Sequence, residues 1–142
     1  MKRTMTIALT LAFLLLSAAD LAGCGSQERV LPVQEAGPVL AYSEAKTDNL
    51  MQAINAGDYK AFSRDLDEAM RGAIPESKWQ GFLDDIRGKV GDYQSRNIES
   101  VRQSGEFYAV VYVAKFSKLD NVTLRVVYRA AEPHAISGLW YK

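Results

Sequence analysis

The side chains able to carry chemistry in this chain of 142 residues are few, and the most reactive of them is a single thiol. Cys24 is the only cysteine, and it follows Leu21, Ala22 and Gly23. A thiolate is a strong nucleophile that forms thioethers and disulfides. The small residues Ala22 and Gly23 let a protease approach the backbone closely. The spacing therefore predicts covalent modification of Cys24 next to a cleavage site.

Other catalytic groups are sparse. His134 is the only histidine, and it follows Glu132 and Pro133 in a predicted turn, where a lone histidine is typically an exposed polar residue. Asp84 and Asp85 are adjacent, so on a helix their side chains point about 100° apart and do not clasp one substrate atom. Pairings typical of metal sites or of nucleophilic catalysis are absent from the sequence. We therefore expect no catalytic residue, no metal and no cofactor.

The segment before Cys24 has the composition of an export signal. Lys2 and Arg3 form a positive start, and residues 5–19 are apolar apart from Thr6, Thr10 and Ser17. A membrane-spanning helix needs about 20 apolar residues, which is more than this run provides before Asp20. We therefore predict that residues 1–23 are a signal peptide that is removed.

Together these features resemble the lipobox signal peptide of bacterial lipoproteins, although Asp20 departs from the usual pattern. The resemblance implies secretion across the cytoplasmic membrane, a lipid on Cys24, and anchoring of the protein to the cell envelope. Because Gly25 and not aspartate follows the cysteine, it implies the outer membrane if the host is Gram-negative. The alternatives for Cys24 are a buried free thiol, an intermolecular disulfide, or a cysteine in a signal that is cut elsewhere.

Removal of residues 1–23 leaves 119 residues, enough for one domain. It also removes Lys2, Arg3 and Asp20, which leaves 15 basic and 16 acidic residues and gives no electrostatic case for binding nucleic acid. Residues 24–41 contain glycine and proline without a sustained apolar period, so we predict a flexible tether there. The single folded domain is then expected over residues 42–142.

Three amphipathic helices are predicted in the first half of this domain. Ser43 caps the first, which ends at Gly57, Asp58 caps the second, and Pro75 starts the third. Their apolar positions recur with the helical period of 3.6 residues, so we expect each helix to bury one face. The predicted buried faces are Leu50, Met51 and Ile54; Phe62, Leu66 and Met70; and Trp79, Phe82, Leu83 and Ile86.

The second half alternates between apolar and polar residues and predicts a four-stranded antiparallel meander over 93–103, 106–116, 121–130 and 134–142. The fold class is therefore α+β, with helices packed on one sheet. Val122, Leu124, Val126 and Tyr128 share the dry face of the sheet. The strand at 106–116 is apolar on both faces, so Phe107, Val111, Val113 and Val127 are the interface residues if the domain dimerises.

Residues 55–59 (Asn-Ala-Gly-Asp-Tyr), the proline-started helix and residues 136–140 (Ile-Ser-Gly-Leu-Trp) resemble the nuclear transport factor 2-like (cystatin-like) superfamily. More narrowly, the chain is similar to a group of secreted domains of unknown function. The resemblance implies a curved sheet wrapped around the helices as a cone whose open end holds a ligand. Aromatic residues at Trp79, Tyr108, Tyr112 and Tyr128 are the candidate pocket.

Three functions fit these observations. The leading hypothesis is a lipid-anchored envelope protein with a non-catalytic domain that binds a small apolar ligand or a protein partner. The first alternative is a structural module that forms a homodimer through the outer sheet face. The second is an isomerase-like enzyme using Tyr112 or Tyr128, which lacks a carboxylate base on the same strand face.

Overall fold

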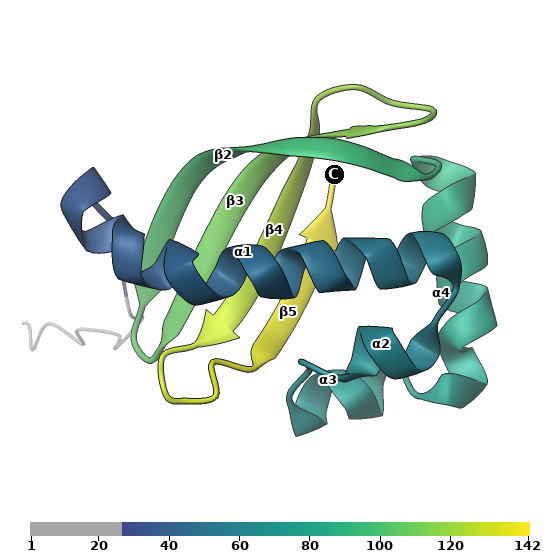
Figure 1. Cartoon of the computed structure of the whole chain (residues 1–142), viewed down its shortest axis with the longest axis horizontal. Helices are drawn as coiled ribbons and strands as arrows, with labels where there is room; N and C mark the ends of the chain where they lie inside the picture. Colours follow the sequence, from purple (N-terminus) through teal and green to yellow (C-terminus); the bar gives the residue numbers. More distant parts are fainter. Residues whose placement is uncertain (1–26) are drawn as a thin grey trace, which may run out of the picture.

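The protein is described by a computed structural model over residues 27–142, so Cys24 and the predicted signal peptide lie outside the described residues. Four helices and a five-stranded sheet make up this part of the chain (Figure 1). The helices are α1 (Val33–Ala56), α2 (Tyr59–Ser63), α3 (Glu68–Ala73) and α4 (Glu76–Lys89). The strands are β1 (Arg29–Val30), β2 (Tyr93–Ser104), β3 (Phe107–Phe116), β4 (Val122–Arg129) and β5 (Ile136–Tyr141). The α+β fold class is confirmed.

The sheet is antiparallel throughout, in the order β1-β2-β3-β4-β5. Its last four strands coincide with the predicted meander to within about two residues at each end. The fifth strand, β1, was not predicted, because two residues carry no alternating pattern. It pairs Val30 with Arg102 of β2, and the N–H of Leu31 donates to Val101 O at 2.8 Å.

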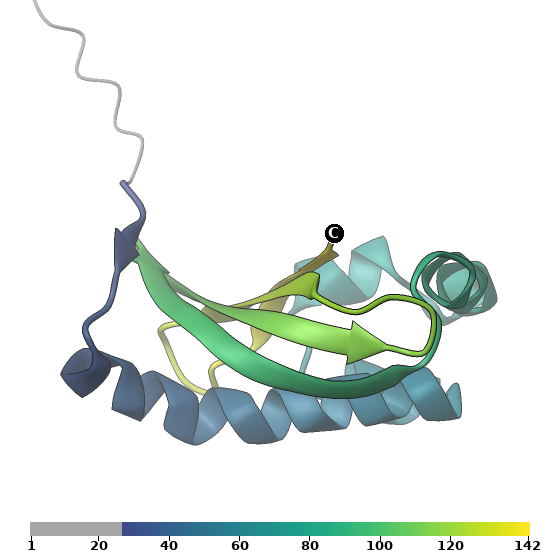
Figure 2. The ribbon, with the colours of Figure 1, turned by 90° about the horizontal axis from the view of Figure 1, so that it is seen from above.

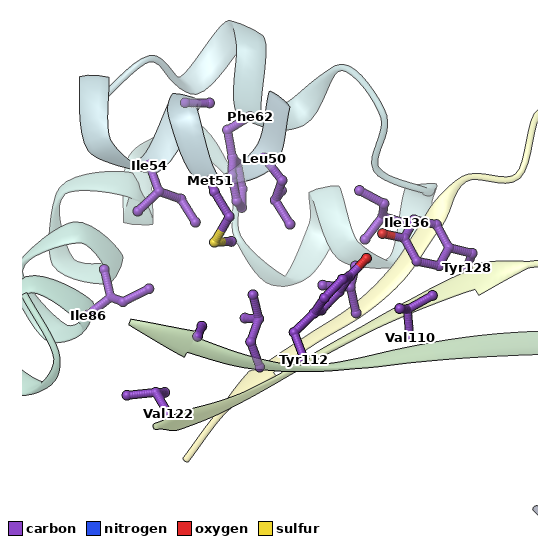
Figure 3. Close-up of a cluster of buried hydrophobic side chains, with 14 of the residues drawn as sticks. Leu50, Met51, Ile54, Phe62, Ile86, Val110, Tyr112, Val122, Tyr128 and Ile136 are labelled. Carbon is purple, nitrogen blue, oxygen red and sulfur yellow. The ribbon is translucent and has the colours of Figure 1, made fainter. Parts of the chain in front are cut away.

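Helix α1 runs across one face of the sheet, and α4 lies at the end of the molecule opposite the start of α1 (Figures 1 and 2). The side of α1 that faces the sheet is buried at intervals of three or four residues, as a helical stripe requires. Figure 3 shows this stripe packed against the predicted dry face of the sheet. Residues of this core with no exposed surface include Leu50, Met51, Phe62, Val110, Tyr112, Leu124, Val126, Tyr128 and Ile136.

The prediction of a flexible tether over residues 24–41 is wrong from Arg29 onward. Arg29 and Val30 form β1, and α1 begins at Val33, ten residues before the predicted cap at Ser43. Ser43 is instead fully buried in the middle of the helix. Ala36 and Val39 extend the buried stripe backward, and this packing outweighs the cost of Pro38 inside the helix.

The predicted second helix is two short helices, α2 and α3. Its first cap is confirmed, since the Asp58 side chain accepts from the N–H of Ala61 at 3.0 Å. The helix breaks after Ser63 because the next residues pair with β5: Leu66 forms a parallel bridge with Ile136, and the N–H of Asp67 donates to Ile136 O at 2.8 Å. Asp67 then caps α3.

The outer face of the sheet, opposite α1, carries a charged cover over its centre. Arg102 and Arg125 lie on β2 and β4, in register with Ala109 and Val111 of β3. Both guanidinium groups pair with the carboxylate of Glu28, at 3.1 Å for Arg102. This arrangement buries Ala109 and Val111, which are each 4% exposed. The centre of the apolar second face of β3 is thus covered within a single copy of the chain, whereas Phe107 and Val113 on the same face stay partly exposed.

Candidate functional site

The candidate site is an open pocket of about 570 Å³ at the N-terminal end of α1. Figure 2 shows the neighbouring ends of β2 and β3 diverging from the first turns of this helix. The pocket lies in that region and is closed on its third side by the loop before β5. Its lining residues are Leu31, Gln34, Glu35, Pro38, Val39, Tyr42, Gln103, Tyr108, Ala130 and His134.

His134 forms one wall of this pocket from an unusual backbone position. Its φ angle is 55°, in the left-handed region that costs a non-glycine residue free energy. The conformation is held by its N–H, which donates to Ala131 O at 2.9 Å, and by Nδ1, which lies 3.3 Å from Arg129 O. The imidazole stacks on the ring of Tyr42, with centroids 3.8 Å apart and planes 8° from parallel. The ring contact thus joins the β4–β5 loop to α1.

Tyr42 has a hydroxyl group that is buried and has no hydrogen-bond partner among residues 27–142. Its ring also makes an edge contact with Tyr128, with centroids 5.9 Å apart. Burial, together with the nearby Tyr108, raises the pKa of Tyr42 to about 12, so the phenol is protonated at neutral pH. A buried hydroxyl without a partner costs about 1–3 kcal/mol. Tyr42 therefore lines the pocket and carries a hydroxyl donor that is unpaired within the described residues.

The rest of the lining is apolar at depth and polar at the rim. Leu31 and Val39 are buried side chains from the segment at the start of α1. At the rim, the side-chain amide of Gln103 donates to the Tyr108 hydroxyl at 3.4 Å. Glu35, the one carboxylate that lines the pocket, is 2.8 Å from Arg29 in an exposed ion pair. The lining is suited to holding a mainly apolar molecule with one or two polar groups.

A family profile described as "Protein of unknown function (DUF3887)" matches residues 47–139, about two thirds of the chain. The chain belongs to the DUF3887 family. No curated protein matches the sequence. The matched range of the DUF3887 domain includes Gln103, Tyr108 and His134 and begins five residues after Tyr42. The predicted likeness to a family of unknown function is confirmed.

The structure does not bring the four predicted pocket aromatics of this DUF3887 protein into one pocket. Tyr108 alone lines the site described above. Trp79 on α4 is 7% exposed and stacks with Phe82, and its indole N–H donates to Gly57 O at 3.1 Å. It lies far from the pocket because α4 packs at the other end of the molecule (Figure 1). Trp79 therefore packs in the core between the helices and does not line the pocket.

Tyr112 and Tyr128 lie in the core between the sheet and α1, and Figure 3 shows their hydroxyls pointing toward each other. The hydroxyl of Thr47 lies within hydrogen-bond distance of both, at 3.1 Å for Tyr112, and its single proton donates to one of them at a time. Tyr128 also donates to Ser43 O at 3.2 Å. Burial raises the pKa of Tyr112 to about 12 and raises that of Tyr128 further. Both phenols are fully buried and hydrogen-bonded, which fits a structural role.

Sequence reasoning missed a carboxylate beside these tyrosines. Tyr112 donates to Glu44 Oε1 at 2.7 Å, and Glu44 also pairs with Arg96 at 3.2 Å. The sequence prediction of a missing base concerned carboxylates on the strands, whereas Glu44 comes from α1. Its signal is the helical spacing of Glu44 and Thr47, which lie three residues apart in the helix that the sequence already predicted after Ser43.

Tyr42 and Gln103 were also missed, and His134 was interpreted only as a turn residue. Tyr42 falls three residues after Val39 on the α1 stripe, which was hidden while residues 24–41 were predicted as tether. Across residues 27–142, no cluster of three or more His, Cys, Asp or Glu residues is arranged to hold a metal ion. The same residues include no helix with the length and apolar character needed to cross a membrane.

Proposed function

We propose that this DUF3887 protein is a lipid-anchored envelope protein whose domain binds a small, mainly apolar molecule in the pocket at the start of α1. The observation that carries the binding role is the buried Tyr42 hydroxyl beside the pocket, which lacks a partner among the described residues. A ligand carbonyl or hydroxyl that accepts from this group would recover the cost of its burial.

The pocket volume of about 570 Å³ lies within the range of small-molecule sites, roughly 300–1,000 Å³. His134 supports the same proposal, because backbone strain is typically retained where it serves a site. The stacked His134 and Tyr42 rings present a rigid edge to a ligand. We infer binding without catalysis, since Glu35, the carboxylate in the lining, is exposed and already paired with Arg29.

The fold and the sequence support the rest of the proposal. A long helix followed by short helices and an antiparallel meander favours the nuclear transport factor 2-like cone, with the pocket at its open end. The lipid on Cys24 and the envelope location rest on the lipobox pattern. A dimer through the outer sheet face is less favoured, because Glu28, Arg102 and Arg125 already cover Val111.

Native mass spectrometry of the full protein, purified from its own membrane, tests both parts. The expected spectrum shows a lipid mass on Cys24 and an additional retained small molecule. Ala130→Trp fills the pocket and is expected to remove the retained molecule, whereas the matched variant Ala131→Trp adds the same ring at an exposed neighbour that does not line the pocket. An unmodified cysteine would contradict the anchor. Equal retention by both variants, or none by the native protein, would contradict the pocket.

A further inference from the structure

A second apolar hollow lies on the other side of Leu31 from the ligand pocket. It has a volume of about 410 Å³ and lies between the first two turns of α1 and the middle of β2. We call it the β1 groove. Val33, Gly37 and Leu40 line it from one face of α1, while Ile98 and Val101 line it from β2. Val30, at the end of β1, completes the wall.

The β1 groove gathers most of the large hydrophobic side chains that are exposed among the described residues. Five large hydrophobic side chains are exposed over residues 27–142, and three of them, Val30, Val33 and Ile98, line this groove. Val33 is 85% exposed at the first position of α1, whose buried face packs in the core. Apolar side chains gathered in this way typically mark an interaction site, whereas scattered ones need no explanation.

The chain between the groove and Cys24 is short. Glu28 is held on the outer face of the sheet by Arg102 and Arg125, and β1 begins at the next residue. Only residues 25–27 separate Cys24 from Glu28. Four Cα-to-Cα steps span at most about 14 Å when fully extended. A lipid on Cys24 would therefore hold Glu28 within about 14 Å of the lipid attachment point, and the groove begins two residues further along the chain, at Val30.

We propose that the β1 groove contacts the surface of the phospholipid bilayer, with Val30, Val33 and Ile98 entering the boundary between headgroups and acyl chains. This inference rests on the proposed lipid anchor at Cys24. Apolar side chains on an interfacial segment bind at this depth of the bilayer. The short connection brings the end of the domain with β1 and the start of α1 toward the membrane, with α4 at the opposite end (Figures 1 and 2).

The charges around the groove distinguish this contact from electrostatic adsorption. Glu99 lines the groove itself, and the nearby Arg29 is neutralised by its ion pair with Glu35 at 2.8 Å. No lysine or arginine lines the groove. The contact is therefore expected to be insensitive to salt and to the fraction of anionic lipid, unlike that of a basic surface.

The test places an environment-sensitive fluorophore, NBD, on the full lipidated protein in phosphatidylcholine vesicles. Because Cys24 is the only native cysteine and its thiol carries the lipid, Val33→Cys supplies the single free thiol for labelling. Leu119→Cys is the matched control: Leu119 is also exposed, and it lies in the β3–β4 turn beside α4. Label at position 33 is expected to be quenched by doxyl-labelled lipid and shielded from aqueous iodide, with no change when NaCl is raised. Label at position 119 is expected to be quenched by iodide and to be unaffected by doxyl-labelled lipid.

Each other outcome has a separate meaning. A protein without a lipid mass on Cys24 contradicts the proposed anchor before any vesicle is used. With the lipid present, equal iodide quenching at positions 33 and 119 contradicts the groove contact while leaving the anchor intact. Shielding from iodide without quenching by doxyl lipid places a second copy or the acyl chains of Cys24 in the groove and also overturns the proposal. Loss of shielding at high salt assigns the contact to charges instead.

Discussion

Replacing Tyr42 with phenylalanine separates the cost of its hydroxyl from the packing of its ring. The hydroxyl is buried without a partner in the described part of the chain, while the ring stacks on His134 at 3.8 Å and contacts Tyr128. Leaving a buried polar group unsatisfied costs about 1–3 kcal/mol, and Tyr42→Phe removes that cost while it keeps both ring contacts. We expect the ligand-free protein to gain about 1 kcal/mol in free energy of unfolding, allowing for partial hydration.

Tyr128→Phe is the matched control. The same atom is removed from a residue with no exposed surface, but here it bonds to Thr47 and donates to Ser43 O at 3.2 Å. Two hydrogen bonds at about 1 kcal/mol each predict a loss of about 1–2 kcal/mol. The two tyrosine variants should therefore differ by about 2–3 kcal/mol, or more than tenfold in the unfolding equilibrium.

Urea unfolding, followed by circular dichroism with both variants in one buffer, measures this difference. Unchanged slopes with denaturant would show that the midpoints report stability. The retained molecule should bind Tyr42→Phe less well than the native protein, so a gain in stability would accompany a loss of ligand. If Tyr42→Phe destabilises the protein as much as Tyr128→Phe does, the hydroxyl has a partner and the argument for the pocket fails.

Two further substitutions test the elements that hold the pocket end in place. Asp67→Ala is expected to lower the free energy of unfolding by about 2–4 kcal/mol, because it removes the cap of α3 and the hydrogen bonds to Ser137 at 2.7 Å and to Arg129 at 3.1 Å. Asp58→Ala removes only the exposed cap of α2 and should cost about 1 kcal/mol in the same urea titration. Burial opposes ionisation of Asp67, but hydrogen bonds from the N–H of Met70 and the side chains of Ser137 and Arg129 lower its pKa overall. The contribution of Asp67 to the free energy of unfolding is therefore present above the unfolded pKa of about 3.9 and is lost as the pH falls through the lower folded pKa. Glu28→Ala releases Arg102 and Arg125, so amide hydrogen exchange should become faster at residues 29–31 while the centre of β3 stays protected. Unchanged exchange at residues 29–31 would mean that β1 is held by its backbone hydrogen bonds alone.

The sheet could be predicted from the sequence because β2, β3 and β4 each have eight or more residues, which is long enough for an alternating pattern of side chains to be recognised. The residues of β4 alternate between buried and half-exposed as expected, and Gly57 ends α1 in the left-handed conformation with φ of 70°. The first turns of α1 were lost because Pro32, Gly37 and Pro38 are typical of a linker. Local propensity is a weak signal there, since the buried Val39 stabilises the helix through contacts distant in sequence.

The site could not be predicted for the same reason. Its walls come from three places in the chain, the start of α1, the β2–β3 end and the β4–β5 loop, and no local pattern links them. The sequence pattern rightly placed Tyr112 and Tyr128 on one face of the sheet, but it could not show that α1 closes over them. His134 gave no signal, because a left-handed φ at a non-glycine residue depends on its surroundings.

The correction at residues 29–41 changes what a lipid on Cys24 would do. A tether of some 17 residues would let the domain drift tens of ångströms from the bilayer, roughly as the square root of its length. The structure instead fixes the chain from Glu28 onward, through the ion pairs to Arg102 and Arg125 and through β1. Leu31, the residue that follows β1, lines both the ligand pocket and the β1 groove. A lipid anchor at Cys24 would therefore orient the domain as well as retain it, and it would hold the pocket next to the membrane, where an apolar ligand is most concentrated.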